Sequence, residues 1–414
     1  MACRRRAVAA LFLVIFLGAL LPAGLAAATE VASAPLSRAA NARNGMVRVY
    51  LSSLGNPTSL DLTVSGSYTA NGATDVTLQS GDRVGISFNK NTGRITMTRG
   101  GVSYDMGTEL NLRRHQTSGE SGLRIAQARQ SGNLYPGDLQ LKAQLSGGSY
   151  RLYPIVHVYI ESYLKGVVPY EMGNSAHVEA LKAQAVAART YTLNKMNTRA
   201  SSLYDVVDTT NDQVYYGNSD STTRCSQAVE ATKGIVLMNG SSLTGTYYTA
   251  SNGGQTESAR NLWGSSGYDY LGVKNDPFDE MNAASVVRKT VVYGDNTFSG
   301  QKSAIKDLLH AKASAAVGSS NVTVTTINAI TPHTPKYGSP SRLYTKLDFA
   351  VTAATPSGSR SLTLTCDIFS ELEGPLGMSI NASQNELWSV EKNGANFTLK
   401  ARRYGHGIGM SQRG

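Results

Sequence analysis

The chain has 414 residues and a formal net charge of +10, and it is long enough to form two or three hydrophobic cores. Its basic residues are scattered, with no Lys/Arg block and no basic segment interleaved with aromatic residues. This pattern favours a solvated basic surface and argues against a nucleic-acid-binding protein. Beyond the first thirty residues, no apolar stretch is long enough to cross a bilayer.

The first 28 residues have the pattern of a secretory signal peptide. Three arginines at 4–6 precede an uncharged apolar run over 7–21, and the alanines at 26–28 offer a cleavage site. We expect cleavage rather than retention as a membrane anchor, and therefore an exported protein. Its net charge would then fall from +10 to +7 with the loss of the three arginines. Residues 29–45 are small and polar without periodicity, which predicts a linker.

Two cysteines, Cys225 and Cys366, remain after such a cleavage. In an oxidising compartment they could form one disulfide, and two buried free thiols fit the sequence equally well. The remaining cysteine, Cys3, lies in the basic start of the signal peptide and not at the cleavage site. No lipidation cysteine therefore stands at the cleavage site.

Alternating hydrophobic residues predict a β-rich region over residues 46–150. Val47, Val49 and Leu51 alternate with polar or aromatic residues, and the pattern returns at 60–64 and 95–97. We expect a second, catalytic region over residues 151–414.

The second region is predicted to contain one prominent helix. Its first strand is expected at 155–160, with Pro154 at the start, where a missing N–H does least harm. Ser175 is a candidate N-cap, Glu179 would occupy the first turn, and helical spacing continues to about Ala200. A shorter helix is expected at 303–315, and further strands at 322–327, 343–349, 362–366 and 397–401. The predicted fold class is α+β, dominated by strands.

A single carboxylate between the predicted strand and the helix is the first candidate catalytic group. Glu171 has apolar and aromatic neighbours over 163–172. Desolvation in such a pocket disfavours the ionised carboxyl group and raises its pKa, as a general acid near neutral pH requires. The alternative is a surface glutamate in a loop.

Arg189 is a second candidate, because helical spacing places it on the apolar face of the predicted helix. A buried guanidinium must be paired, and Glu171 or a bound acidic ligand could supply the partner. The alternative is an arginine whose charged end reaches water along the edge of that face.

Two segments rich in small residues complete the candidates. Residues 246–257 combine tyrosines, hydroxyls and a Gly-Gly turn, and 405–412 place three glycines around His406. The first suits sugar binding, although a hairpin turn would look the same. We expect positive φ and close backbone approach at Gly405, Gly407 and Gly409. The chain has no G-x-S-x-G, H-E-x-x-H or C-x-x-C motif, so a serine hydrolase of that class or a zincin has no support.

Taken together, these segments resemble the SpoIID/LytB family, the stage II sporulation protein D and amidase-enhancer proteins of bacterial walls. The matching stretches are 163–172, 179–191, 212–215, 247–254 and 405–412. The resemblance implies a SpoIID-like fold and a lytic transglycosylase acting on peptidoglycan strands stripped of their peptides by an amidase. It makes Glu171 the catalytic acid–base group. The residues expected to bind substrate are Arg189, Tyr191, Tyr248, Ser251, Gly253, Gly254, His406, Ser411 and Gln412.

The sequence departs from the family at three places. Thr249, Ala250 and Asn252 stand where relatives often carry more serines. Between the helix and the Tyr-Tyr segment there is only Cys225 and no histidine, where some relatives bind zinc, so we predict no metal and no cofactor. The chain stops at Gly414, where relatives continue into a closing helix, and we therefore expect the His406 region to be poorly held.

A rival hypothesis is a non-catalytic wall-binding module that stimulates a separate cell-wall amidase. Both hypotheses predict glycan binding, and only the enzyme requires Glu171.

Overall fold

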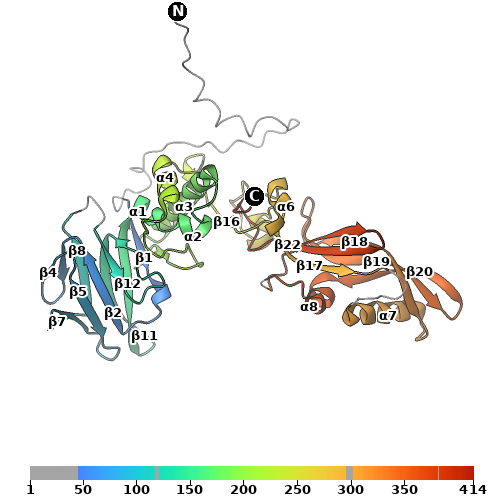
Figure 1. Cartoon of the computed structure of the whole chain (residues 1–414), viewed down its shortest axis with the longest axis horizontal. Coiled ribbons are helices and arrows are strands. Elements are labelled where there is room, and N and C mark those ends of the chain that lie inside the picture. Colours follow the sequence, from blue (N-terminus) through green and yellow to red (C-terminus); the bar gives the residue numbers. More distant parts are fainter. Residues whose placement is uncertain (1–44, 117–120, 295–301, 381) are drawn as a thin grey trace, which may run out of the picture.

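The computed structural model describes residues 45–116, 121–294, 302–380 and 382–414. The predicted signal peptide, and all of the predicted linker except Gly45, lie outside these residues. Figure 1 shows two strand-rich lobes, with the C-terminus between them. The strand-rich α+β class is therefore confirmed.

The first lobe contains two β-sheets that share one hydrophobic core. The seven-stranded sheet has the order β13 (Val206–Val207), β1 (Met46–Tyr50), β12 (Ser149–Tyr159), β11 (Asp138–Ser146), β8 (Glu109–Arg114), β3 (Tyr68–Asn71) and β4 (Val76–Leu78). The six-stranded sheet has the order β10 (Tyr135–Pro136), β9 (Gly122–Ile125), β2 (Ser59–Ser65), β5 (Arg83–Phe88), β6 (Ile95–Arg99) and β7 (Val102–Gly107). Alternate residues of β1 and β2 are buried, as the hydrophobic alternation predicted, because one face of each strand packs on this core.

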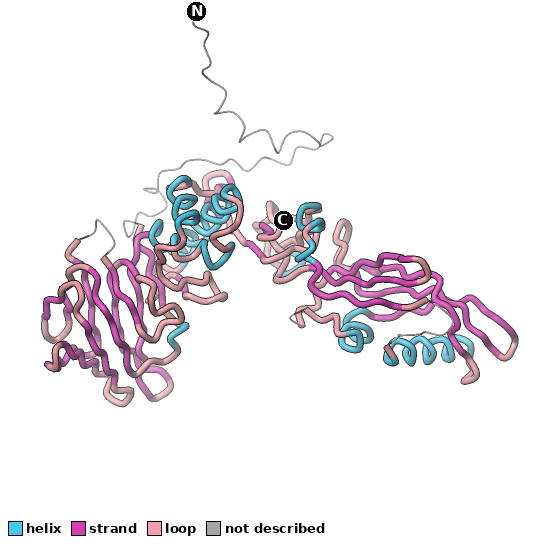
Figure 2. Tube along the Cα trace, viewed as in Figure 1, coloured by secondary structure: helices cyan, strands magenta, loops and turns pink. Residues whose placement is uncertain are grey.

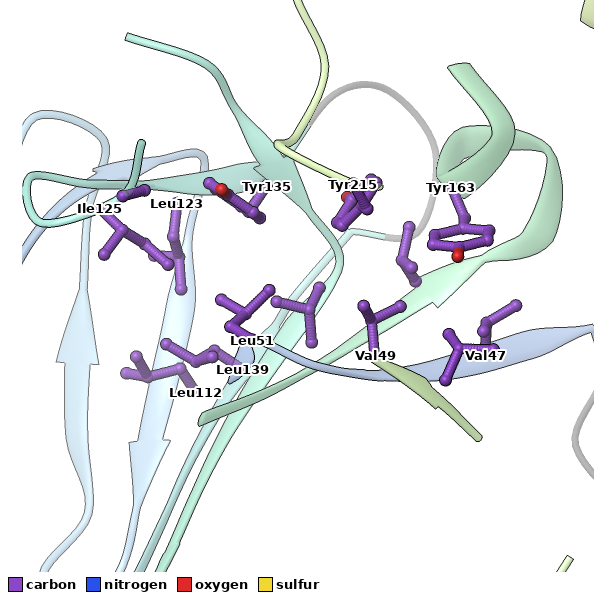
Figure 3. Close-up of a cluster of buried hydrophobic side chains, with 14 of the residues drawn as sticks. Val47, Val49, Leu51, Leu112, Leu123, Ile125, Tyr135, Leu139, Tyr163 and Tyr215 are labelled. Atoms are coloured by element: carbon purple, nitrogen blue, oxygen red, sulfur yellow. The ribbon is translucent and has the colours of Figure 1, made fainter. Parts of the chain in front are cut away.

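Four helices follow the sheets along the chain: α1 (Ile160–Lys165), α2 (Val168–Met172), α3 (Val178–Thr198) and α4 (Thr223–Ala231). Figure 2 shows these helices gathered at the end of the sheets that faces the second lobe. Figure 3 shows Val47 and Val49 of β1, and Leu51 just after it, extending the core from the sheets toward Tyr163 of α1. The helices that carry the candidate site are thus fixed to the sheets by one continuous core.

The structure corrects two local predictions in this lobe. The helix begins at Val178, and His177 rather than Ser175 is its N-cap, because the His177 ring accepts the Glu179 N–H. Pro154 lies inside β12 and not at its start. The proline is tolerated there because it faces β1 just beyond the last residue of that strand, so its missing N–H costs no hydrogen bond between the two strands. Its carbonyl oxygen still accepts the Leu51 N–H at 2.9 Å.

The predicted boundary between residues 150 and 151 also lies inside β12, and one core covers both sides of it. A second core is formed by residues from Val292 to Ala401. The division between hydrophobic cores therefore comes much later in the chain than the predicted one.

The second lobe contains two three-stranded sheets and a helix. The sheets have the orders β17 (Val286–Val292), β22 (Asn396–Arg402), β21 (Leu387–Asn393) and β18 (Thr323–Pro335), β19 (Tyr344–Thr355), β20 (Gly358–Asp367). The predicted shorter helix is present as α7 (Ser303–Val317), and α8 (Glu373–Leu376) follows β20.

The remaining short elements are β14 (Met238–Asn239), β15 (Ser242–Leu243), β16 (Tyr248–Thr249), α5 (Ala259–Trp263), α6 (Pro277–Met281) and β23 (Met410–Ser411). Met238 of β14 and Leu243 of β15 pack against the core of the first lobe. β16 and β23 pair in parallel, so the end of the chain is attached to the Tyr-Tyr segment. The expectation that the His406 region is poorly held is wrong, because Ile408 is fully buried and Met410 and Gln412 are bonded to the chain around β16.

The two cysteines are free and buried in different cores, Cys225 in the first and Cys366 in the second. Of the two alternatives left by the sequence, the structure has two buried thiols. Within the described ranges, no helix is both long and apolar enough to span a membrane.

Candidate active site

A pocket of about 430 Å³ contains Glu171 and brings together segments that are distant in the sequence. Its walls come from α2, α3, the 210–212 turn, the strand β16, the helix α5 and the segment before β23. The lining residues are Glu171, Tyr191, Thr210, Asn211, Asp212, Thr246, Tyr247, Tyr248, Thr249, Ala250, Trp263, Tyr404, Gly405, His406 and Gln412. Five of the predicted site residues therefore meet here: Glu171, Tyr191, Tyr248, His406 and Gln412.

Glu171 lies in the five-residue helix α2, which begins with Val168 and Pro169. Proline suits the first turn of a helix because its missing N–H would have no partner there. Burial raises the pKa of the Glu171 carboxyl group, while hydrogen bonds from Gln412, the Val214 N–H and Tyr248 partly lower it. The Val214 and Gln412 donors are each 3.3 Å from a carboxylate oxygen. Glu171 is therefore a desolvated acid in a lined pocket and not a surface glutamate.

A chain of hydrogen bonds orients the Tyr248 hydroxyl group. The Gln213 amide oxygen accepts hydrogen bonds from Tyr163 (3.2 Å) and Thr192 (2.8 Å). This fixes the amide so that its nitrogen donates to the Tyr248 oxygen at 3.0 Å. Since that oxygen accepts from Gln213, the tyrosine proton is left to be donated to Glu171.

Replacing Tyr248 by phenylalanine is expected to raise the pKa of Glu171 further. The lost hydrogen bond favours the ionised carboxylate, so its removal favours the protonated form. The shift should be about one pH unit, since a hydrogen bond to a charged group contributes about 1.5 kcal/mol. The measurement is the pH titration of the Glu171 carboxyl carbon by NMR.

Tyr170→Phe is the matched control, because Tyr170 also lies in α2 and its hydroxyl oxygen accepts a hydrogen bond from Asn133. Equal Glu171 titration curves in wild type and Tyr248→Phe would show that the tyrosine proton does not reach the carboxylate.

Asp212 is the second carboxylate that lines the pocket, and each of its oxygens already has two donors. One oxygen accepts from Tyr191 (2.8 Å) and Lys195 (3.0 Å), and the other from Arg199 and the Val207 N–H (both 2.9 Å). Burial acts to raise the pKa of Asp212, but these hydrogen bonds outweigh it and lower the pKa. Its side chain is only 2% exposed. Asp212 is thus a fixed anion that orients Tyr191 and has no free oxygen directed at the pocket.

His406 forms part of an aromatic wall. Its ring centroid lies 5.4 Å from that of Trp263 and 6.4 Å from that of Tyr247. The ring Nδ1 accepts the Ile408 N–H at 3.0 Å, and the ring also bonds the Tyr248 backbone. Burial lowers the pKa of His406, so the ring is neutral near pH 7. The glycines beside it have positive φ, as predicted, and a Cβ at Gly409 would lie 2.0 Å from the Tyr247 carbonyl oxygen.

His406→Ala is expected to weaken ligand binding in this pocket by about tenfold or less, because one ring contact of the aromatic wall is lost. Titration calorimetry with denuded glycan strands measures the effect, and circular dichroism checks folding. His115→Ala, at an exposed histidine outside the pocket, is the control. A folded His406→Ala protein that binds strands normally but is catalytically dead would instead make His406 part of the chemistry.

Arg189 lies in the core and not in the pocket, which corrects its predicted contact with substrate. Its side chain is fully buried, and two of its nitrogens bond the Glu161 carboxylate at 3.0 and 2.7 Å. The third nitrogen bonds the Ile235 carbonyl oxygen at 3.1 Å. The buried guanidinium of Arg189 is paired, as predicted. Its partner is Glu161 of α1 and not Glu171 or a ligand.

The hydroxyl groups of Ser251 and Ser411 are also directed away from the pocket. Both donate to Asp279 of α6, which also accepts the Asn252 N–H at 2.7 Å. Gly253 has φ +75° and its Cβ position lies 2.8 Å from the Arg403 nitrogen. Gly254 is buried beside Glu280. These predicted substrate contacts are therefore supports that hold β16 and β23 in place.

Asp279 and Trp263 were not among the residues predicted from the sequence, and Gln213 was included only as part of the matching stretch 212–215. Nothing in the sequence connects Gln213 or Asp279 with their distant partners. Trp263 did carry a signal, because it is one of two tryptophans and stands in a polar, glycine-rich stretch. It is 41% exposed in the structure. Within the described residues, no group of three or more His, Cys, Asp and Glu side chains could hold a metal ion.

Comparisons with known proteins identify similar sequences. The family model SpoIID (Stage II sporulation protein) matches residues 149–239. The chain is 30% identical over 278 residues to stage II sporulation protein D of Bacillus subtilis (strain 168), which covers 63% of this chain and 68% of that protein. It is 33% identical over 270 residues to the amidase enhancer of the same organism, covering 61% of this chain and 36% of that protein. An uncharacterised protein of Brachyspira hyodysenteriae is 43% identical over 106 residues, which are 29% of its length. The chain thus spans about a third of the length of the last two relatives.

Proposed function

Because the chain belongs to the SpoIID family, we propose that it is a lytic transglycosylase that cleaves denuded peptidoglycan strands with Glu171 as its acid–base group. One observation carries the proposal: of the described residues that line the pocket, Glu171 and Asp212 have carboxyl groups, and Glu171 is the one suited to proton transfer. Burial raises the pKa of Glu171 although both of its oxygens accept hydrogen bonds, whereas the pKa of Asp212 is lowered and Lys195 and Arg199 hold that carboxylate as an anion.

The number of available carboxyl groups favours transglycosylation over hydrolysis. A glycosidase with two carboxyl groups needs one as acid and the other as base or nucleophile. In transglycosylation, the C6 hydroxyl of the muramic acid attacks its own anomeric carbon. Protonated Glu171 gives its proton to the departing glycosidic oxygen, and its carboxylate takes the proton of the attacking hydroxyl. The anomeric C–O bond breaks, a 1,6-anhydro ring forms, and no water is consumed.

The pocket supports each part of this step. Burial keeps Glu171 protonated at a higher pH than a solvated glutamate, as the acid role requires. Tyr248 and the Val214 N–H bond the carboxylate and stabilise it after proton donation. Trp263, Tyr247 and His406 provide ring faces against which a sugar can stack.

Mass spectrometry of products from peptide-free glycan strands tests the proposal. Anhydromuramic ends are the expected result. Reducing ends would indicate hydrolysis, and Asp212→Asn would then show whether Asp212 takes part.

The second candidate function is non-catalytic, and the name of one relative, amidase enhancer, favours it. In that case the protein would bind strands, leave them intact and increase the activity of a cell-wall amidase. Binding without any cleavage product in the same assay would favour this function over the enzyme.

A further inference from the structure

A second pocket, of about 510 Å³, adjoins the Glu171 pocket. The two pockets share Tyr191, Thr246 and Tyr247 as lining residues. The second pocket is also lined by Tyr268, Tyr270, Asn239 of β14 and both residues of β15, and we name it the Tyr268 pocket. A ligand in the Glu171 pocket can therefore continue past Tyr247 into it.

Aromatic rings run through both pockets in sequence. The centroid of Tyr247 lies 4.8 Å from that of Trp263 on the Glu171 side and 6.1 Å from that of Tyr268 on the other. Tyr270 follows at 6.0 Å from Tyr268. Side-chain amides and hydroxyls stand beside the rings, from Asn194, Thr198, Asn239, Ser242 and Ser266. Ring faces with a few polar groups suit sugar rings, which have apolar faces and polar edges.

The charge of the Tyr268 pocket favours an acidic sugar. Of the described residues that line it, Lys195 is the one with a charged side chain. Its ammonium group lies 3.0 Å from Asp212 and 5.1 Å from the Tyr191 ring centroid. An ammonium has three N–H donors, so it can also bond a ligand carboxylate.

We propose that the Tyr268 pocket binds a further, carboxylate-bearing sugar of the strand held at Glu171, so that longer strands bind better than short ones. This inference rests on the proposed function for its substrate class. Each pocket has the volume of a small-ligand site, and a linear polymer can fill both only by crossing Tyr247. The lactyl carboxylate exposed when a stem peptide is removed is the acidic group that Lys195 would bind.

Binding to the Glu171→Gln protein tests the inference without any cleavage. Titration calorimetry compares denuded glycan disaccharides and octasaccharides. Tyr268→Ala removes one ring, and Ser266→Trp fills part of the pocket from an exposed position. Each is expected to weaken octasaccharide binding by about tenfold and disaccharide binding by a smaller factor. Tyr104→Ala is the matched control, because Tyr104 is equally half-buried but lies in β7 and lines neither pocket.

The acidic sugar is tested with an equally long oligomer of N-acetylglucosamine, which has no carboxylate. It is expected to bind more weakly than the denuded strand, and Lys195→Met should reduce the difference. Octasaccharide affinity that is unaffected by Tyr268→Ala and Ser266→Trp, or equal affinity for the two oligomers, would overturn the inference. Length-dependent binding together with a wild-type protein that cleaves nothing would overturn the proposed catalysis alone.

Discussion

Glu171→Gln is expected to abolish strand cleavage while leaving the protein folded and able to bind glycan. Glutamine keeps the shape of the side chain but cannot donate the proton to the glycosidic oxygen. General acid–base catalysis contributes about 10²–10⁴-fold to the rate. The loss should lie at the upper end, because the same group would perform both proton transfers. Steady-state cleavage of denuded strands measures it.

Glu179→Gln is the matched control, since this glutamate is exposed in the first turn of α3 and bonds Lys182. It makes the same chemical change near the pocket and should leave the rate unchanged. Near-normal cleavage by folded Glu171→Gln protein would remove Glu171 from the mechanism.

The same substitution has a consequence for stability that does not depend on catalysis. The folded-state pKa of Glu171 is raised, so the protonated group favours the folded protein. As the pH rises through the unfolded-state pKa to the folded-state pKa, the wild type loses this stability because the unfolded chain ionises first. Glutamine cannot ionise. The melting temperature of Glu171→Gln relative to wild type should therefore be higher at neutral pH than in acid.

The sequence predicted the elements best where one physical pattern determines them. Val47 and Val49 alternate with less buried residues because β1 has one buried face, and buried Leu51 continues this alternation just after the strand ends. Gly409 predicted a close backbone approach, and the structure has the Tyr247 carbonyl against it. The apolar and aromatic residues at 163–172 predicted that the Glu171 carboxyl group is desolvated, and in the structure burial raises its pKa.

The remaining features depend on contacts between distant residues. Ser251 and Ser411 are 160 positions apart, and their hydroxyls would look the same in the sequence whether they faced a sugar or Asp279. The predicted boundary at residues 150 and 151 falls inside β12, which pairs with β1 and β11 in the seven-stranded sheet. Pairing between strands, rather than a change in composition, determines which residues share a core.

Arg189 is the clearest case of a contact that the sequence could not identify. Replacing it is expected to have the largest effect on stability. Its position on the apolar face of α3 required a partner, but several acids in the sequence could have supplied it. The structure identifies Glu161, which also accepts the Gly234 N–H at 3.2 Å. The Glu161–Arg189 ion pair joins α1 to α3, and both residues also bond the turn after α4. Helix α2, which carries Glu171, lies between α1 and α3 along the chain.

Arg189→Met is therefore expected to lower the free energy of unfolding by about 3–5 kcal/mol, because Glu161 would remain buried without its charged partner. Arg189→Lys should recover only part of the loss, since an ammonium group cannot form both hydrogen bonds to the carboxylate. The double variant Glu161→Met/Arg189→Met should be more stable than the single Arg189→Met, because it leaves no unpaired charge in the core. Urea denaturation of the four proteins measures these differences. If Arg189→Met instead unfolded like the wild type and lost only strand cleavage, the arginine would act on the substrate, and the ion pair would not be what holds α1 against α3.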